Sequence, residues 1–133
     1  MKLLIVDDSL VVRNAIDRAV QSGDVHVGEL TNVHRAENGA RAVELFASER
    51  PDMVTMDLTM PELDGLGAIR RIREIEPDAS ILVISALNSH KTALEAIKNG
   101  ACGFLTKPFT EIEVVDALKK LASHARLRTV ARA

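Results

Sequence analysis

The nine residues 53–61, MVTMDLTMP, determine the architecture that we predict for this chain of 133 residues. Apolar residues lead up to a single carboxylate, Asp57, and Pro61 follows soon after it. Such a run, from residue 51 to residue 57, predicts a short strand buried on both faces, as in parallel sheets. In open α/β sheets, ligands bind beyond the carboxyl ends of the strands. Asp57 is therefore a candidate site residue, although a single isolated aspartate at this place is more often a solvated loop residue.

Four other segments also have the composition of strands, namely residues 3–6, 32–36, 81–84 and 103–106. The segment 32–36 is short and weak, which predicts a strand at the edge of a sheet. Apolar residues at helical spacing fill the intervals between the strands, and residues 24–31 fit either an extension of the first helix or a loop. Five strands that alternate with five helices predict a parallel sheet with helices on both faces and right-handed crossovers.

The helical spacing also predicts which side chains face the core. The last helix should begin with a capping box, because Glu113 lies three residues after Thr110. Gly23 is expected near the end of the first helix, and residues 99–100, Asn-Gly, after the fourth. The predicted core positions are Val12, Ile16 and Ala19 or Val20; Ala40, Val43, Phe46 and Ala47; Leu66, Ile69, Ile72 and Ile75; Leu94 and Ile97; and Ile112, Val115, Leu118 and Ala122.

The composition predicts one cytoplasmic domain. Hydrophobic residues make up 47% of the chain, and its amino terminus becomes acidic too soon for a signal peptide. The one cysteine, Cys102, suits a reducing compartment and is expected to be a small hydrophobic residue near the last strand. A net charge of −2 and an aromatic content of 2% favour neither nucleic acid nor membranes as partners.

Polar side chains follow four of the predicted strands, and the strands of a parallel sheet all end at one edge. Asp7 and Asp8, Asp57, Ser85 and Lys107 should therefore converge. Two like charges ~4 Å apart at an effective dielectric constant of ~20 repel each other by about 4 kcal/mol. A cluster of three acids therefore suggests a bound cation, and carboxylates with few neutral ligands suit Mg²⁺.

This set of groups is suited to phosphoryl transfer. Asp57 could attack a phosphoryl group and hold it as an aspartyl phosphate, with Lys107 and the metal balancing charge and Ser85 donating to a phosphate oxygen. Taken singly, each part has a simpler explanation. One of the first two aspartates could cap the first helix, which Ser9 could do as well, and Lys107 could be a surface lysine.

The chain resembles the CheY-like receiver domains of bacterial two-component response regulators over nearly its whole length. The resemblance is carried by four motifs: LIVDDS at residues 4–9, MDLTMPELDG at 56–65, ISA at 84–86 and KPF at 107–109. It implies a flavodoxin-like α/β fold, a doubly wound five-stranded parallel sheet in the order 2-1-3-4-5 with five helices.

The resemblance also implies roles for individual residues. Asp57 would accept the phosphoryl group, and Lys107, followed by a cis bond to Pro108, would pair with it. Asp8, Asp57 and the Thr59 carbonyl would ligate Mg²⁺, or Mn²⁺, with Asp7 acting through metal-bound water. Ser85 would be the switch hydroxyl and Phe104, in place of the more common tyrosine, the aromatic switch.

The implied protein is a stand-alone receiver over residues 1–125, with a short basic tail at 126–133 that contains Arg126, Arg128 and Arg132. We expect this tail to be a frayed, solvated helix end. A sensor histidine kinase or a histidine phosphotransfer protein would donate the phosphoryl group, and a phosphatase could remove it. A downstream protein would bind the face formed by the fourth helix, the fifth strand and the fifth helix. Residues 101–103 lack an acid that one DNA-binding subfamily uses in dimer contacts.

Two other functions are compatible with parts of this pattern. A Mg²⁺-dependent phosphatase of the aspartyl-phosphate type would need a second acid at position 59, where the chain has Thr59. A flavodoxin-type carrier would direct Asp7 and Asp8 at the flavin phosphate, which is unfavourable. The four histidines, His26, His34, His90 and His124, show no ligand spacing.

Overall fold

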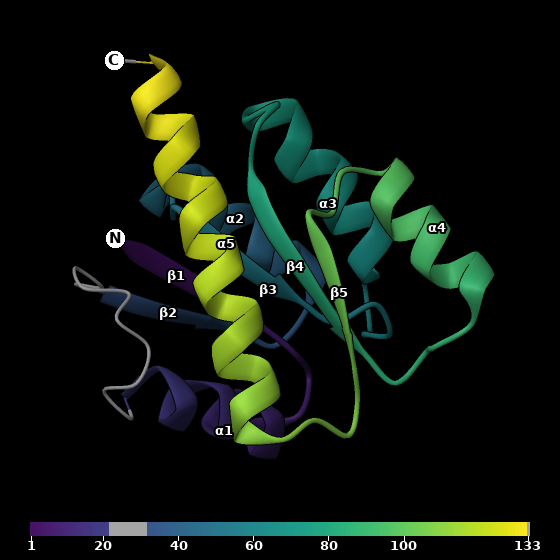
Figure 1. Ribbon diagram of the computed structural model, residues 1–133. Helices are drawn as coiled ribbons and strands as arrows, with labels where there is room; N and C mark the ends of the chain where they lie inside the picture. The colour runs from purple at the N-terminus through teal and green to yellow at the C-terminus, as the bar shows by residue number, and fades with distance from the viewer. Residues whose placement is uncertain (22–31, 133) are drawn as a thin grey trace.

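The computed structural model describes residues 1–21 and 32–132, except for the side chains of 129–132. Strands and helices alternate along the chain (Figure 1). The strands are β1 (Lys2–Val6), β2 (Asn32–Ala36), β3 (Met53–Met56), β4 (Ser80–Ser85) and β5 (Gly103–Thr106), and the helices are α1 (Leu10–Gln21), α2 (Gly39–Glu49), α3 (Gly65–Ile75), α4 (His90–Lys98) and α5 (Glu111–Arg132). The predictions about Gly23 and residues 24–31 fall outside the described residues.

The five strands form one parallel sheet in the order β2-β1-β3-β4-β5. This confirms the predicted fold class and places β2 at an edge, as the weak apolar character of residues 32–36 suggested. Alternate residues of each central strand enter different cores. Leu4 and Val6 pack with residues of α2, α3 and α4, whereas Leu3 and Ile5 pack with residues of α1 and α5. Because both faces are covered, the strands need continuous apolar runs rather than alternation.

Most predicted core positions are buried or partly buried, but those on α4 and at the start of α5 are wrong. Leu94 and Ile97 are 51% and 48% exposed, and Ala96 is the buried residue of α4. Ile112 is 81% exposed, and Val114 enters the core in its place. The capping box of α5 is confirmed, because Thr110 N–H donates to Glu113 Oε1 over 2.9 Å and Glu113 N–H donates to Thr110 Oγ1 over 3.2 Å.

In α2 the predicted face is wrong at Ala47. Ala47 is exposed, whereas Ala42 is buried beside Phe46. The errors in α2 and in α4 have the same cause. α2 and α4 each bury a narrow stripe, and an apolar side chain beside such a stripe satisfies the helical spacing without reaching the core.

The expectation of a frayed basic end is wrong for Arg128. α5 continues through residue 132 toward the end marked C in Figure 1. Arg128 Nη1 donates to the Asp78 carbonyl over 3.2 Å, and Nη2 lies 4.0 Å from the Asp52 carboxylate. Asp52 also accepts from the Lys2 backbone N–H over 2.8 Å. Arg128 therefore packs the second half of α5 against the segments that lead into β3 and β4.

Candidate phosphoryl-transfer site

Backbone hydrogen bonds hold three of the predicted site residues at the carboxyl ends of their strands. Asp7 N–H donates to the Ala36 carbonyl over 3.1 Å, and Asp57 N–H donates to the Val6 carbonyl over 3.0 Å. Lys107 N–H donates to the Ser85 carbonyl over 2.9 Å. Each of these bonds continues the ladder by one residue beyond the strand. The side chains of these residues are therefore positioned by the sheet itself.

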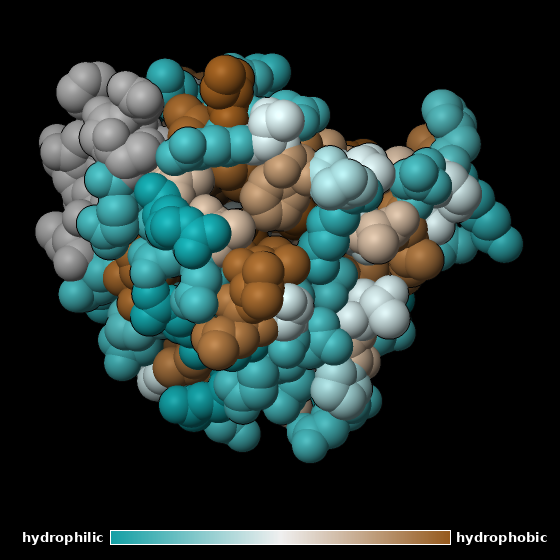
Figure 2. Space-filling view, turned by 90° about the horizontal axis from the view of Figure 1, so that it is seen from below, coloured by the Kyte–Doolittle hydropathy of each residue, from teal (hydrophilic) through white to brown (hydrophobic). Residues whose placement is uncertain are grey.

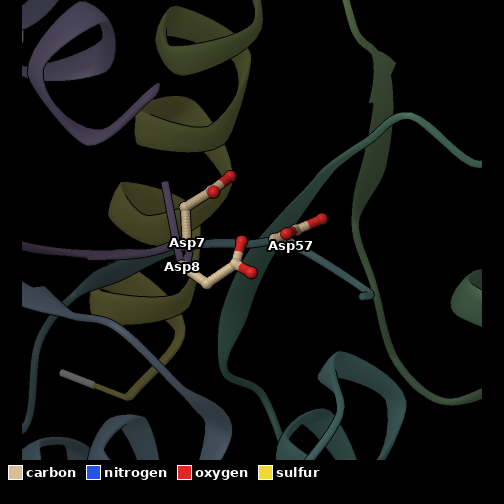
Figure 3. Close-up of side chains that lie close together, drawn as sticks. All are labelled: Asp7, Asp8 and Asp57. Carbon is tan, nitrogen blue, oxygen red and sulfur yellow. The ribbon is translucent and has the colours of Figure 1, made fainter. Parts of the chain in front are cut away.

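Three carboxylates meet at this edge, as the sequence predicted (Figure 3). One oxygen of each of Asp7, Asp8 and Asp57 lies within 4.8 Å of the others. Asp7 and Asp57 are buried, with 1% and 5% of their surface exposed, whereas Asp8 is exposed. Two acids thus form the floor of the site and one lies at its opening.

Lys107 reaches this cluster from the loop after β5. Its Nζ lies 2.7 Å from Asp7 Oδ2 and 3.6 Å from Asp57 Oδ2, and 18% of its side chain is exposed. This ammonium group pairs with two of the three carboxylates, Asp7 and Asp57, so the cluster keeps an excess of negative charge. The peptide bond between Lys107 and Pro108 is cis, as the resemblance implied.

The start of α1 settles the question of which residue caps that helix. Ser9 Oγ accepts from Val12 N–H over 3.3 Å, while the Asp7 carboxylate accepts from Ser9 N–H over 2.9 Å. Arg13 was not predicted to belong to the site, yet its Nη1 donates to the Asp7 carbonyl over 2.6 Å. Because Ser9 caps the helix, the exposed Asp8 carboxylate stays available to a ligand.

Burial raises the pKa of the Asp57 carboxyl above its ordinary value, and the Asp7 carboxylate raises it further. Lys107 and the Thr59 N–H, which lies 3.4 Å from Asp57 Oδ1, lower this pKa, and Asp8 adds a smaller increase. Burial and repulsion outweigh the attraction. The ionised form of Asp57 is therefore disfavoured in the folded protein until a cation compensates it.

We expect Asp57→Asn to stabilise the protein at neutral pH, by about 1–2 kcal/mol. The pKa of Asp57 is higher in the folded than in the unfolded protein. The contribution of this group to the free energy of unfolding is therefore fully present below about pH 3.8, and it is lost as the pH rises through the folded pKa. Asparagine removes that loss and leaves the pair of Lys107 with Asp7 intact. Thermal melts in chelator across a pH series measure the effect. A gain that stays constant down to acidic pH would contradict this explanation.

The other predicted residues lie around this cluster. The Thr59 backbone follows Asp57 directly, and its side chain is exposed. Ser85 is fully buried, and its Oγ accepts from Leu87 N–H over 3.1 Å rather than bonding to Asp57. Phe104 lies in β5, partly buried against the core under α4. Their functional roles remain predictions.

Two glycines bring the loop after β3 and the start of α3 against the site. A Cβ on Gly65 would lie 2.1 Å from the Asp57 carbonyl oxygen, and one on Gly39 would lie 2.1 Å from the Leu63 carbonyl oxygen. Gly65 N–H also donates to the Leu58 carbonyl over 3.0 Å. The close approach of backbone to backbone at Gly65 therefore positions the strand end that carries Asp57.

The donor set suits a hard divalent cation. Three carboxylates offer oxygen ligands within one small volume, and their excess charge is what such an ion would neutralise. Asp8, being exposed, leaves one side open to solvent and to a second ligand. Residues Asp7, Asp8 and Asp57 are thus able to hold a metal ion.

Comparisons with known proteins agree with this geometry. The family model for the response regulator receiver domain matches residues 3–119. The chemotaxis protein CheY of Listeria monocytogenes is 42% identical over 122 residues, which cover 92% of this chain and 98% of that protein. CheY of Thermotoga maritima is 43% identical over 122 residues, with coverages of 91% and 97%.

Solved structures show the same fold. The CheX–CheY–BeF₃–Mg²⁺ complex from Borrelia burgdorferi superposes with a TM-score of 0.83 at 27% identity, covering 91% of this chain and 88% of that chain. The response regulator domain of Thermotoga maritima CheB gives a TM-score of 0.79 at 29% identity, covering 95% and 96%. The chain belongs to the response regulator receiver family, the phosphoacceptor switches of two-component signalling.

Proposed function

We propose that this receiver is switched by phosphorylation of Asp57 in the presence of Mg²⁺. The observation that supports it most directly is the burial of Asp57 among two further carboxylates and one ammonium group. An Asp57 oxygen attacks the phosphorus atom of a phosphohistidine, a P–O bond forms, and the P–N bond breaks with its electron pair going to the imidazole. Asp8, Asp57 and the Thr59 carbonyl would hold the metal, and Asp7 would act through a water molecule. When bound, Mg²⁺ neutralises the charge that builds up on the phosphoryl oxygens.

Lys107 has a second task in this proposal. Its Nζ is 3.6 Å from Asp57 Oδ2, close enough to pair with a phosphoryl oxygen attached there, while it stays bonded to Asp7. Ser85 then turns from Leu87 N–H toward the phosphoryl group, and the Phe104 ring moves into the space it leaves. The phosphoryl group shifts this equilibrium by bonding differently to the two arrangements.

Intact-mass measurement after incubation with acetyl phosphate and Mg²⁺ tests the proposed acceptor. We expect one added phosphoryl group on the wild-type protein and none on Asp57→Asn. Asp52→Asn is a suitable control, because Asp52 lies at the opposite ends of the strands and should leave labelling unchanged. Equal labelling of wild type and Asp57→Asn would assign the phosphoryl group to another residue.

The donor protein has an apolar surface to bind beside the site. Leu10 and Val11, in the first turn of α1, are 59% and 75% exposed, and only Ser9 separates them from Asp8 in the sequence. Figure 2, which views the molecule from below Figure 1, shows hydrophobic groups lying among hydrophilic ones on that side. We propose that a sensor histidine kinase or a histidine phosphotransfer protein contacts Leu10 and Val11 while its histidine reaches Asp57.

We therefore expect Val11→Asp to slow phosphoryl transfer from a phosphorylated histidine phosphotransfer protein by about tenfold or more, because truncating a hot-spot residue near the centre of an interface costs about 2 kcal/mol or more. Labelling by acetyl phosphate, which needs no protein contact, should be unchanged. Leu127→Asp is the matched control, since Leu127 is 70% exposed and lies near the far end of α5. If both variants slow transfer equally, α1 is not the docking surface.

The signal leaves, in this proposal, by the face that α4, β5 and α5 form. Leu94 and Ile97 are the exposed apolar residues of α4, and β5 is an edge strand of the sheet. Phe104 lies in that strand, so a movement of its ring changes this face. A downstream protein that binds here would distinguish the phosphorylated from the unphosphorylated receiver.

A further inference from the structure

A hollow lies beside β5, away from the acidic cluster. Its volume is about 440 Å³, and it is lined by apolar residues of β4, β5 and α5 together with polar residues of α5. Two of the lining residues are Cys102, just before β5, and His124, on α5. Neither has a role in the proposed phosphoryl transfer.

Cys102 and His124 are neighbours in space although they are 22 residues apart. Cys102 Sγ lies 3.6 Å from His124 Nε2 and 3.8 Å from Nδ1, and it is also 3.8 Å from the Ala79 carbonyl oxygen. The cysteine lies just before β5, near the last strand as expected, but it is exposed to solvent. An exposed thiol beside an imidazole differs chemically from a thiol in an apolar core.

Ser80 holds the ring of His124. Ser80 Oγ is 2.6 Å from His124 Nδ1, and Ser80 itself is 1% exposed. Cys102 Sγ is almost equally far from the two ring nitrogens, and because Ser80 engages Nδ1, Nε2 is the nitrogen left to take the thiol proton. If Nε2 accepts the thiol proton, both ring nitrogens carry hydrogen, and the Ser80 oxygen can accept from Nδ1 while Nε2 donates to the thiolate.

The remaining charged groups of the hollow are already paired. Lys120 Nζ lies 3.2 Å from Asp116 Oδ2, and Glu113 accepts from the Thr110 N–H. The carboxylates of Asp116 and Glu113 are therefore each bound to a partner other than Cys102. Among the lining residues, His124 carries the ionisable side chain that contacts Cys102.

We propose that Cys102, His124 and Ser80 form a thiol-modification site that reacts with small disulfides. His124 Nε2 takes the thiol proton, and the Cys102 thiolate attacks one sulfur of the disulfide. A new S–S bond forms to Cys102 as the original S–S bond breaks, and the other half leaves as a thiolate that then takes up a proton. Cys102 is oxidised and the departing half is reduced, so electrons balance. His124 and Ser80 are positioning residues in this reaction.

The hollow gives the attached group a place beside β5 and α5. A mixed disulfide at Cys102 would cover Leu105, Ala117 and Leu121, which line the hollow. The modification site is separate from Asp57, and its test uses the unphosphorylated protein. A failure of either proposal therefore leaves the other standing.

Oxidised glutathione is the probe, and intact mass measures the rate at which the adduct forms. At neutral pH we expect the wild-type protein to react at least about tenfold faster than His124→Gln, because a free thiol, of pKa about 8.5, is mostly protonated there. The wild-type rate should change little toward alkaline pH, whereas the His124→Gln rate should rise steeply and approach it. Ser80→Ala should fall between them, and Cys102→Ala should form no adduct.

The pH profile separates this proposal from a merely exposed thiol. Wild type and His124→Gln with equal rates and equal pH profiles would overturn it, as would an adduct on Cys102→Ala. Thermal melts of each variant show whether it is folded. If His124→Gln does not fold, the wild-type profile alone decides: a rate that follows the ionisation of a free thiol overturns the proposal.

Discussion

Gly65→Ala should destabilise the protein by at least about 3 kcal/mol and distort the site around Asp57. The added Cβ would lie 2.1 Å from the Asp57 carbonyl oxygen and 2.6 Å from the Leu58 Cα, against an unstrained separation of ~3.5 Å. Both contacts are with backbone atoms, so no side-chain rotation can relieve them. α3 must move away from β3, which stretches the hydrogen bond from Gly65 N–H to the Leu58 carbonyl. Urea unfolding measures the loss.

Gly67→Ala is the matched control for this effect. It lies two residues further along the same helix, but its Cβ would first meet Leu63 Cδ1, at 2.7 Å, the end of a flexible side chain. Alanine also favours a helix over glycine by about 1 kcal/mol, so the net change should be within about 1 kcal/mol of zero. If the two variants are equally stable, the close approach at Gly65 does not constrain the fold.

Lys107→Ala should also be strongly destabilising when no divalent cation is present, by about 3–5 kcal/mol. It leaves the carboxylates of Asp7 and Asp57, which are 1% and 5% exposed, without the ammonium group that lies 2.7 and 3.6 Å from them. Two buried like charges then repel each other in a medium that screens them poorly. Lowering the pH should recover stability, because protonation removes one of these charges.

Mg²⁺ should restore part of the loss, since a ligand that binds the folded form stabilises it in proportion to its occupancy. Urea unfolding in chelator and in excess Mg²⁺ measures both effects. Lys120→Ala is the control, because Lys120 pairs with Asp116 on the exposed surface of α5 and should change stability by less than about 1 kcal/mol. A Lys107→Ala loss no larger than this would contradict the assignment of Lys107 as counter-ion of the site.

The sheet could be predicted because its signal is local. The apolar runs of β1, β3 and β4 and the polar residues that end them are contiguous in sequence, and parallel strands necessarily end at one edge. This was sufficient to group Asp7, Asp8, Asp57 and Lys107. Arg13 and Gly65 were harder to assign to the site, because their contacts with Asp7 and Asp57 join separate elements.

The errors concern surfaces rather than elements. Helical spacing identifies an apolar face, but Leu94, Ile97 and Ile112 show that an apolar residue on a helix need not reach the core. Which of them is covered depends on where neighbouring elements lie. The contact of Arg128 with Asp52 and Asp78 is of the same kind, because it joins residues 76 and 50 positions apart.

The sequence by itself determined the alternation of strands and helices, the parallel sheet, and the edge at which the charged residues gather. Each follows from the apolar pattern and from the direction of the strands. Only the tertiary structure decided the distances at that edge, the dominance of burial and repulsion over Lys107 in raising the pKa of Asp57, and the meeting of Cys102, His124 and Ser80. These depend on the packing of α5 against the sheet and on solvent exclusion, which no local pattern of residues specifies.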